Sequence, residues 1–112
     1  MASGTIVDFA ATDKATYIKF DSGIMIAWGS ESVPSGNTTG STALMAYSGS
    51  KDVDVSALGF TSIIAAFANA VDSPAYWNAN ANIKSATVIN LGLGGDNANG
   101  KTVRWFAIGK WS

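Results

Sequence analysis

Cysteine and histidine are both absent from this chain of 112 residues. Without cysteine no disulfide framework can form, so the fold must be stabilised by side-chain packing and by subunit contacts. Without histidine, zinc sites built on Cys and His and catalytic triads with a histidine base are excluded. Asp and Asn oxygens are the donors left for a hard cation. We predict neither a cofactor nor a bound metal.

Charged residues are also scarce, because they make up 13% of the chain, roughly half the usual share. The net charge is −1, and the seven Lys and Arg are scattered from Lys14 to Lys110 without forming a run. Nucleic-acid binders carry a clustered basic face, so nucleic acid is not an expected partner. The polar surface must come from Ser, Thr, Asn and Gly, which favours neutral hydrogen-bonding partners.

Two further absences concern export and membranes. Residues 1–4 lack the basic stretch and apolar core of a signal peptide. No apolar run approaches the roughly 20 residues that span a bilayer, so we expect no membrane insertion. Hydrophobic residues nevertheless make up 47% of the chain, which is enough for the core of one small domain.

The hydrophobic pattern is β-like along most of the chain. Residues 15–20 and 24–28 are rich in β-forming residues and flank the turn Asp21-Ser22-Gly23, which predicts a hairpin. Residues 61–71 contain enough alanine for a helix, but strand candidates lie on both sides, and we interpret them as a strand. Further short strands are expected at residues 42–48, 52–55, 83–93 and 102–111.

Polar, Gly- and Asn-rich segments separate these strands. We interpret residues 30–40, 72–82 and 94–100 as loops. Six to eight short strands with turns between them predict an all-β fold, a small antiparallel β-sandwich. The sandwich would occupy residues 15–112, with residues 1–14 as a lead-in segment.

Residues 95–102, GDNANGKT, match the P-loop pattern of nucleotide-binding proteins. That motif works only when a helix starts at the lysine, because the free amides and dipole of the helix hold the phosphate. Here the lysine is followed by β-branched and aromatic residues. We therefore interpret the segment as an Asn-Gly turn that joins two antiparallel strands.

Asp52 and Asp54 are the closest pair of acids that could suggest catalysis. Two residues apart in a strand, they would share one face about 7 Å apart, with Val53 and Val55 on the other. Hydrolysis of a glycoside needs carboxylates on both sides of the bond, and the sequence places no further acid near this pair. We expect a solvated strand face and no enzymatic activity.

The best candidate ligand contacts lie in the predicted loops at residues 72–82 and 94–100. Aromatic rings stack on the apolar face of a sugar while amides bond its hydroxyls, and such rings in polar loops also suit protein recognition. The alternative is that the aromatic pair covers the core or a subunit interface, and that Asp and Asn serve only as turn residues. The candidates are Tyr76, Trp77, Asn78, Asn80, Asn82, Asp96, Asn97 and Asn99.

Two segments resemble the C-terminal domains of bacteriophage tail fibres. Residues 17–29, YIKFDSGIMIAWG, are similar to the opening of such domains, which has an aromatic-rich strand, a turn ending in Ser-Gly, an aliphatic strand and Trp-Gly. Residues 105–109, WFAIG, are similar to their closing strand. The likeness spans residues 15–112 and is thinnest over residues 41–54.

The resemblance implies an H-type lectin-like sandwich that forms a homotrimer at the tip of a virion's tail fibre. It implies binding to a surface polysaccharide or surface protein of the host bacterium, without assigning individual binding residues. Trimerisation would bury aromatic surface that so short a chain does not bury alone. Trp28, Trp105 and Trp111 are candidates for the core or for a subunit interface. The core is the favoured place for Trp28 and Trp105, and the interface for Trp111.

Two other functions are compatible with the sequence. A structural trimerisation or virion decoration domain would form the same trimer and never contact a receptor. A surface depolymerase would release reducing sugar from a capsule, although the acids at Asp52 and Asp54 give it little support.

Overall fold

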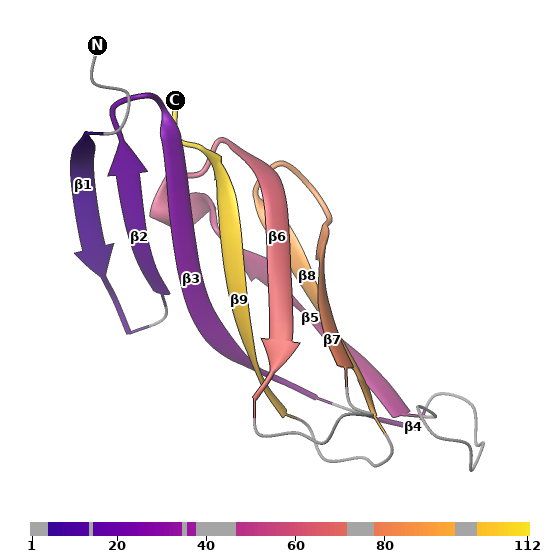
Figure 1. Cartoon of the computed structure of the whole chain (residues 1–112). Helices are drawn as coiled ribbons and strands as arrows, with labels where there is room; N and C mark the ends of the chain where they lie inside the picture. The colour runs from indigo at the N-terminus through magenta and orange to yellow at the C-terminus, as the bar shows by residue number, and fades with distance from the viewer. Residues whose placement is uncertain (1–4, 14, 35, 38–46, 72–77, 96–100) are drawn as a thin grey trace.

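The computed structural model describes residues 5–13, 15–34, 36–37, 47–71, 78–95 and 101–112. Within these residues the chain is almost entirely strand, with one short 3-10 helix, η1 (Ser56–Leu58) (Figure 1). The strands are β1 (Ile6–Ala11), β2 (Ala15–Phe20), β3 (Ile24–Val33), β4 (Gly36–Asn37), β5 (Tyr47–Asp54), β6 (Ser62–Ala70), β7 (Asn78–Ile83), β8 (Val88–Gly95) and β9 (Lys101–Lys110).

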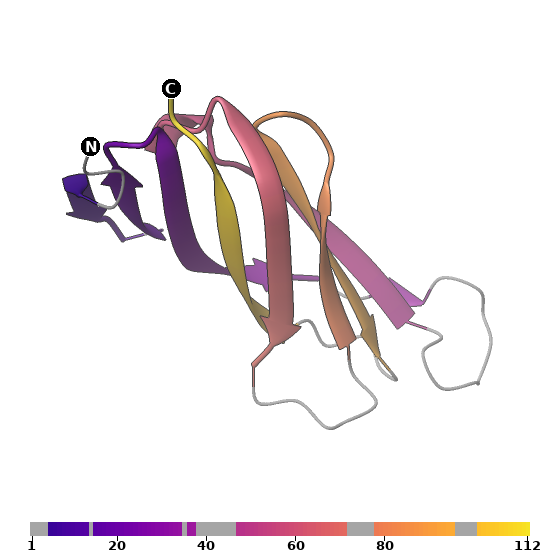
Figure 2. The same cartoon turned by 45° about the horizontal axis from the view of Figure 1, so that its top comes forward.

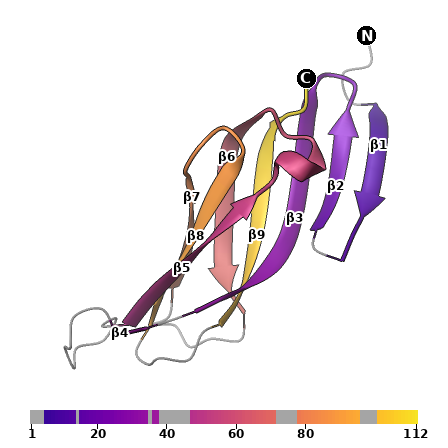
Figure 3. The same ribbon diagram turned by 180° about the vertical axis from the view of Figure 1, so that it is seen from behind.

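The strands form two antiparallel sheets, which confirms the predicted all-β sandwich. Sheet A has the order β1-β2-β3-β9-β6, and sheet B has the order β4-β5-β8-β7. β6 lies beside β7, so the two sheets come together along this edge (Figures 1 and 2). Strands β1 and β2 extend sheet A past sheet B, as the view from behind shows (Figure 3).

Local turn chemistry explains the first hairpin, which the sequence predicted. Gly23 has φ of 92°, a left-handed conformation that glycine adopts without strain, and its N–H donates to the carbonyl of Phe20. β2 and β3 then pair in register from Ala15–Gly29 to Lys19–Met25. The residues 6–11 of the lead-in segment form β1, which adds to this hairpin at the edge of sheet A.

The core lies between the sheets and is entirely apolar among the described residues. Alternate residues of β3 and β9 point inward, and they meet the inward side chains of β8. The core residues are Ala15, Met25, Ala27, Val33, Val55, Phe60, Ile63, Ile89, Leu91, Leu93, Val103, Trp105 and Ala107. Trp105 is thus a core residue, as expected.

The two ends of the molecule differ in what they carry. β4, β6 and β8 end at one end of the sandwich, and β5, β7 and β9 begin there (Figure 2). We call it the loop end, because the segments 38–46, 72–77 and 96–100 attach to it. β1 begins and β9 ends at the opposite end (Figure 1). With extents of 57 × 24 × 20 Å, the molecule is long enough to keep these ends far apart.

Several sequence predictions need correction. β3 continues to Val33 and β4 follows at Gly36–Asn37, so residues 30–40 are not simply a loop. The strand expected at residues 83–93 is interrupted, because residues 84–87 separate β7 from β8. The strand expected at residues 61–71 is confirmed as β6, and the last strand as β9. Residues 42–46 lie outside the described residues.

The P-loop interpretation is excluded, because Lys101 begins strand β9 and not a helix. The proposed hairpin turn was also wrong, since β8 belongs to sheet B and β9 to sheet A. β8 and β9 are therefore not paired with each other. No helix in the described part of the chain is long and apolar enough to cross a bilayer.

An alanine at Gly109 is expected to destabilise the protein. Its Cβ would collide with the backbone oxygen of Ser62 and stand 3.0 Å from the Cα of Ile63, so β6 would have to move away from β9. Overpacking of this kind costs about 1–3 kcal/mol in the free energy of unfolding. Urea unfolding at one protein concentration measures the loss.

Gly92→Ala provides the matched control for that substitution. The nearest atom to its added Cβ is Oδ1 of Asn80 at 2.6 Å, the end of a side chain that can turn away. We expect its free energy of unfolding to change by less than about 0.5 kcal/mol. Equal losses in the two variants would contradict the close approach of β6 and β9 at Gly109.

Candidate functional site

The candidate residues Asn78, Asn80 and Asn82 lie on a strand and not in the predicted loop. They form β7 in alternation with Ala79 and Ala81, and these alanines pack against the core. Asparagine is unfavourable in strands, which is why composition suggested a loop. The period of two between Asn and Ala was the signal that could have identified the strand.

Strand pairing places Asn80 and Asn82 opposite a glycine and a polar residue on the outer face of sheet B. Asn82 pairs with Asn90 of β8, which pairs with Asp52 of β5. One step toward the loop end, Asn80 pairs with Gly92, and Gly92 pairs with Ser50. The next row is Asn78, Gly94 and Ser48. We call this surface the amide face.

The middle strand of the amide face has no side chains in the last two rows, because β8 carries glycine there. Asn80 lies over Gly92, with its Oδ1 2.6 Å from where a Cβ would stand. Its Oδ1 also accepts a hydrogen bond from Nδ2 of Asn82 at 3.3 Å. The result is an exposed surface of neutral amide and hydroxyl groups, suited to hydroxyl-bearing ligands.

A polar network closes the other end of the amide face. Lys84 Nζ donates to Oδ2 of Asp52 at 2.6 Å, and Asn90 Nδ2 donates to Oδ1 at 2.8 Å. The bond from Lys84, and then that from Asn90, lowers the pKa of Asp52 below its ordinary value. Asp52 is therefore ionised at neutral pH, and its carboxylate is fixed by the hydrogen bonds from Lys84 and Asn90.

Lys84→Met is expected to raise the pKa of Asp52 toward its ordinary value, because the hydrogen bond that lowers it most is lost. A carboxyl group whose pKa is lowered in the folded state stabilises the protein at pH values above its ordinary pKa. This contribution is lost as the pH falls through the folded-state pKa. The variant should therefore be less stable at neutral pH and equal to the parent in strong acid. A carboxyl-carbon NMR titration checks the pKa.

Lys51→Met is the control for that titration, because Lys51 pairs with Glu31 on the inner side of β5. In the Lys51→Met variant, the pKa of Asp52 should equal that in the parent protein. If Lys84→Met leaves the titration of Asp52 where it was, the bond from Lys84 does not hold the carboxylate in solution.

Asp54 has a structural partner. Its Oδ1 accepts a hydrogen bond from the backbone N–H of Ser56 at 2.9 Å at the start of η1, and this bond lowers the pKa of Asp54. Asp52 and Asp54 are exposed while Val55 is buried, so the predicted solvated alternation is confirmed. Among the described residues, no group of three or more acids could hold a metal ion.

The outer face of sheet A is apolar. Register aligns Phe67, Phe106 and Trp28 in one cross-strand row, and Ile108, Ile26 and Ile18 in the next. The rings of Phe67 and Phe106 are 6.5 Å apart, centroid to centroid. Phe9 of β1 extends the second row. We call this surface the aromatic face.

The aromatic face corrects the expectation for Trp28. Trp28 is 38% exposed, whereas the neighbouring Ala27 is buried. The side chain of Trp28 therefore lies on the outer face of sheet A, and Trp28 is not a core residue of this chain. Phe106 is 37% and Phe67 62% exposed. Such an extended apolar surface is unusual on an isolated soluble domain. Trp111 is half-buried, and its Nε1 donates to the carbonyl of Phe20 at 2.8 Å.

The other candidate contacts, Tyr76, Trp77, Asp96, Asn97 and Asn99, lie outside the described residues. The strands beside them are described. Tyr76 and Trp77 directly precede β7, and Asp96 directly follows β8. Because Asn78 pairs with Gly94, both segments attach at the loop end of the amide face.

No protein-family model matches the chain, and no curated protein sequence does. Solved structures do match. The P. aeruginosa R1 pyocin fibre superposes with a TM-score of 0.61 at 15% identity, over 95% of this chain and 28% of the fibre chain. An N-truncated R1-type pyocin tail fibre matches with a TM-score of 0.60 at 16% identity, over 95% of this chain and 87% of the fibre chain. An N-truncated R2-type pyocin tail fibre matches with a TM-score of 0.57 at 14% identity, over 96% of this chain and 39% of the fibre chain.

These identities are low, so the likeness establishes the fold alone, and the chain spans about a quarter of the R1 fibre chain. Almost the whole of this chain takes part in each match. The finer likeness to H-type lectins stays a prediction. The chain has the fold of a pyocin tail-fibre domain, which confirms the tail-fibre resemblance of its sequence at the level of the fold.

Proposed function

We propose that this chain is the receptor-binding domain of a phage-type tail fibre and that it binds glycan on the host cell surface. The observation that carries the proposal is the fold, which pyocin tail fibres share over 95% of this chain. The protein would act from the tip of the fibre, as part of the virion. We propose no catalytic role.

The amide face and the adjoining loop end are the proposed glycan contact. Asn80 and Asn82 offer amide donors and acceptors on an exposed and nearly uncharged surface, which suits sugar hydroxyls. Tyr76 and Trp77 precede β7 directly, so they can supply the aromatic surface on which a sugar ring stacks. Asp96, Asn97 and Asn99, which follow β8, complete the proposed contact.

The aromatic face is the proposed contact between three copies of the chain. An exposed row of Phe67, Phe106 and Trp28 supports burial against identical surfaces, because burying apolar area drives most association. In such a trimer the amide faces would point outward. Three weak glycan sites on one tip would then act together and raise avidity by orders of magnitude.

Labelling of bacterial cells by a fluorescent fusion of the chain tests the proposed function. Selective labelling of some strains in a broad panel is the expected result. The expected result fails if a folded trimer labels no strain, including strains sensitive to the phage or pyocin particle that carries the fibre. That outcome would favour a structural trimerisation or virion decoration domain. Release of reducing sugar from the labelled cells would instead indicate a depolymerase.

A further inference from the structure

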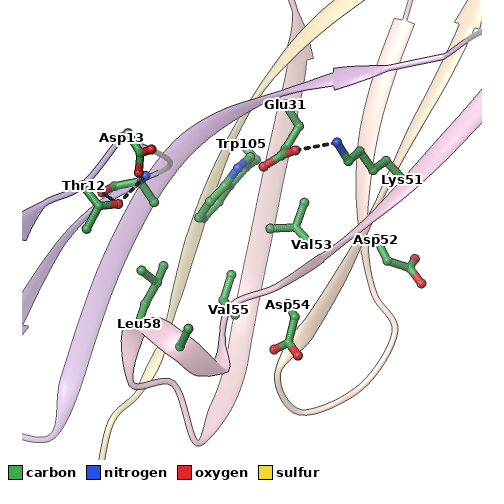
Figure 4. A pocket seen from close by; sticks show the side chains of 12 residues that line it. Thr12, Asp13, Glu31, Lys51, Asp52, Val53, Asp54, Val55, Leu58 and Trp105 are labelled. Carbon is green, nitrogen blue, oxygen red and sulfur yellow. Dashed lines mark hydrogen bonds and ion pairs between the residues drawn. The ribbon is translucent and has the colours of Figure 1, made fainter.

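A cleft opens between the two sheets beside η1. It has a volume of about 480 Å³ and lies among the start of β2, the last residues of β3, β5 and η1 (Figure 4). Pockets that enclose small ligands commonly measure 300–1,000 Å³. Asp52 of the amide face lies at its rim, whereas the amide-face asparagines are not part of its lining.

Trp105 in the cleft carries an unsatisfied donor. Its side chain is 97% buried, since 3% is exposed, and it lines the cleft. Its Nε1 is buried without a hydrogen-bond partner, the single such side-chain atom among the described residues. Indole N–H is a donor only, and buried donors in proteins are almost always paired. The cleft thus presents a donor that requires an acceptor.

An ion pair covers this donor. Glu31 of β3 and Lys51 of β5 pair at 2.9 Å across the two sheets, and the nitrogen edge of the indole points toward Glu31 (Figure 4). The side chain of Lys51 is 46% exposed, and partly exposed ion pairs contribute little to stability. A ligand atom can therefore reach Nε1 when the Glu31 side chain turns aside.

The remaining lining sets the chemistry of the ligand. Val53, Ala57 and Leu58 form an apolar wall, while Asp13 places a carboxylate at the exposed rim. An anionic ligand would be repelled by this carboxylate and by that of Glu31. A ligand with an acceptor for the indole, a methyl group for the apolar wall and hydroxyl donors for the rim would satisfy every group.

We propose that this cleft binds a sugar unit bearing an acylamino group, separately from the amide face. The acyl carbonyl accepts the hydrogen bond of Trp105 Nε1. The acyl methyl packs against Val53 and Leu58, and the ring hydroxyls donate to Asp13. A plain hexose lacks the carbonyl and methyl, and a sugar with a free amine lacks both as well.

The test follows the indole N–H signal of Trp105 by ¹H–¹⁵N NMR in the intact protein, assigned with Trp105→Phe. The probes are N-acetylglucosamine, N-acetylgalactosamine and N-acetylmannosamine, each beside its free-amine and hexose counterparts. We expect saturable movement of the Trp105 signal with at least one N-acetyl sugar and none with its counterparts. No movement with any N-acetyl sugar, or equal movement with the free amines, would overturn the proposal.

Ala57→Trp supplies the blocking variant, because Ala57 is exposed and lines the cleft, so a larger side chain fills it without entering the core. Ala86→Trp, an exposed alanine in the β7–β8 turn, is its control. The sugar response should be lost in the first and kept in the second. Because this readout uses purified protein and monosaccharides, its failure would leave labelling of cells through the amide face unaffected.

Discussion

Phe106→Glu is expected to convert a trimer of this chain into a monomer. Phe106 lies at the centre of the row between Phe67 and Trp28, on the face of β9 that points away from the core. A charge buried there without a partner costs about 3–5 kcal/mol, and the three subunits place three such charges in one interface. The weakening of assembly should therefore reach several orders of magnitude in concentration.

Light scattering during size-exclusion chromatography measures this change, with circular dichroism to show that the sheets remain. Thr102→Glu is the control, because Thr102 is an exposed residue on the same side of β9 but beyond the aromatic row. It should remain trimeric. A parent protein that is monomeric at all concentrations, or a trimer that tolerates glutamate at Phe106, would contradict assembly through the aromatic face.

The paired substitution Asn80→Ala and Asn82→Ala is expected to abolish labelling of cells. Both side chains are exposed on the amide face, and their removal leaves the inward alanines of β7 in place. Each hydrogen bond lost to a ligand is worth about 1 kcal/mol, so affinity at one site falls by about tenfold or more. Three sites that act together multiply this loss to at least a hundredfold in avidity.

Titration of labelled cells by flow cytometry measures that loss. Asp21→Ala, an exposed change in the β2–β3 turn at the opposite end of the molecule, is the control and should label like the parent. If the asparagine variant labels cells with undiminished affinity, while remaining trimeric, the amide face does not contact the receptor.

Sequence reasoning succeeded where the information was local. The β2–β3 hairpin follows from β-forming residues around Asp21-Ser22-Gly23, and Gly23 adopts the left-handed conformation that this turn requires. The alternation around Val53 likewise gave the correct inward and outward faces of β5. These features depend on neighbours in the chain, so pattern and turn chemistry determine them.

The candidate site depended on pairings that a single segment does not reveal. Asn82, Asn90 and Asp52 share a row only because β7 and β5 both pair with β8, and this register appears only in the fold. Trp28 was misplaced for a similar reason. Its strand carries apolar residues on both faces, so alternation could not show which face lies inside.

The unsatisfied donor of Trp105 was equally invisible in the sequence. An aromatic residue in a terminal strand predicts a core position, and Trp105 occupies one. Whether its N–H has a partner depends on β3 and β5, which lie far from it along the chain but line the same cleft. Sequence reasoning therefore predicted its burial and missed its chemistry.

Labelling of a sensitive strain after two treatments tests the central claim of glycan recognition most directly. Protease digestion removes exposed surface proteins, whereas mild periodate cleaves the vicinal diols of sugars. We predict that labelling by the trimer survives the protease and is lost after periodate. Labelling that is lost after protease and unaffected by periodate would contradict a glycan receptor and assign the binding to a surface protein.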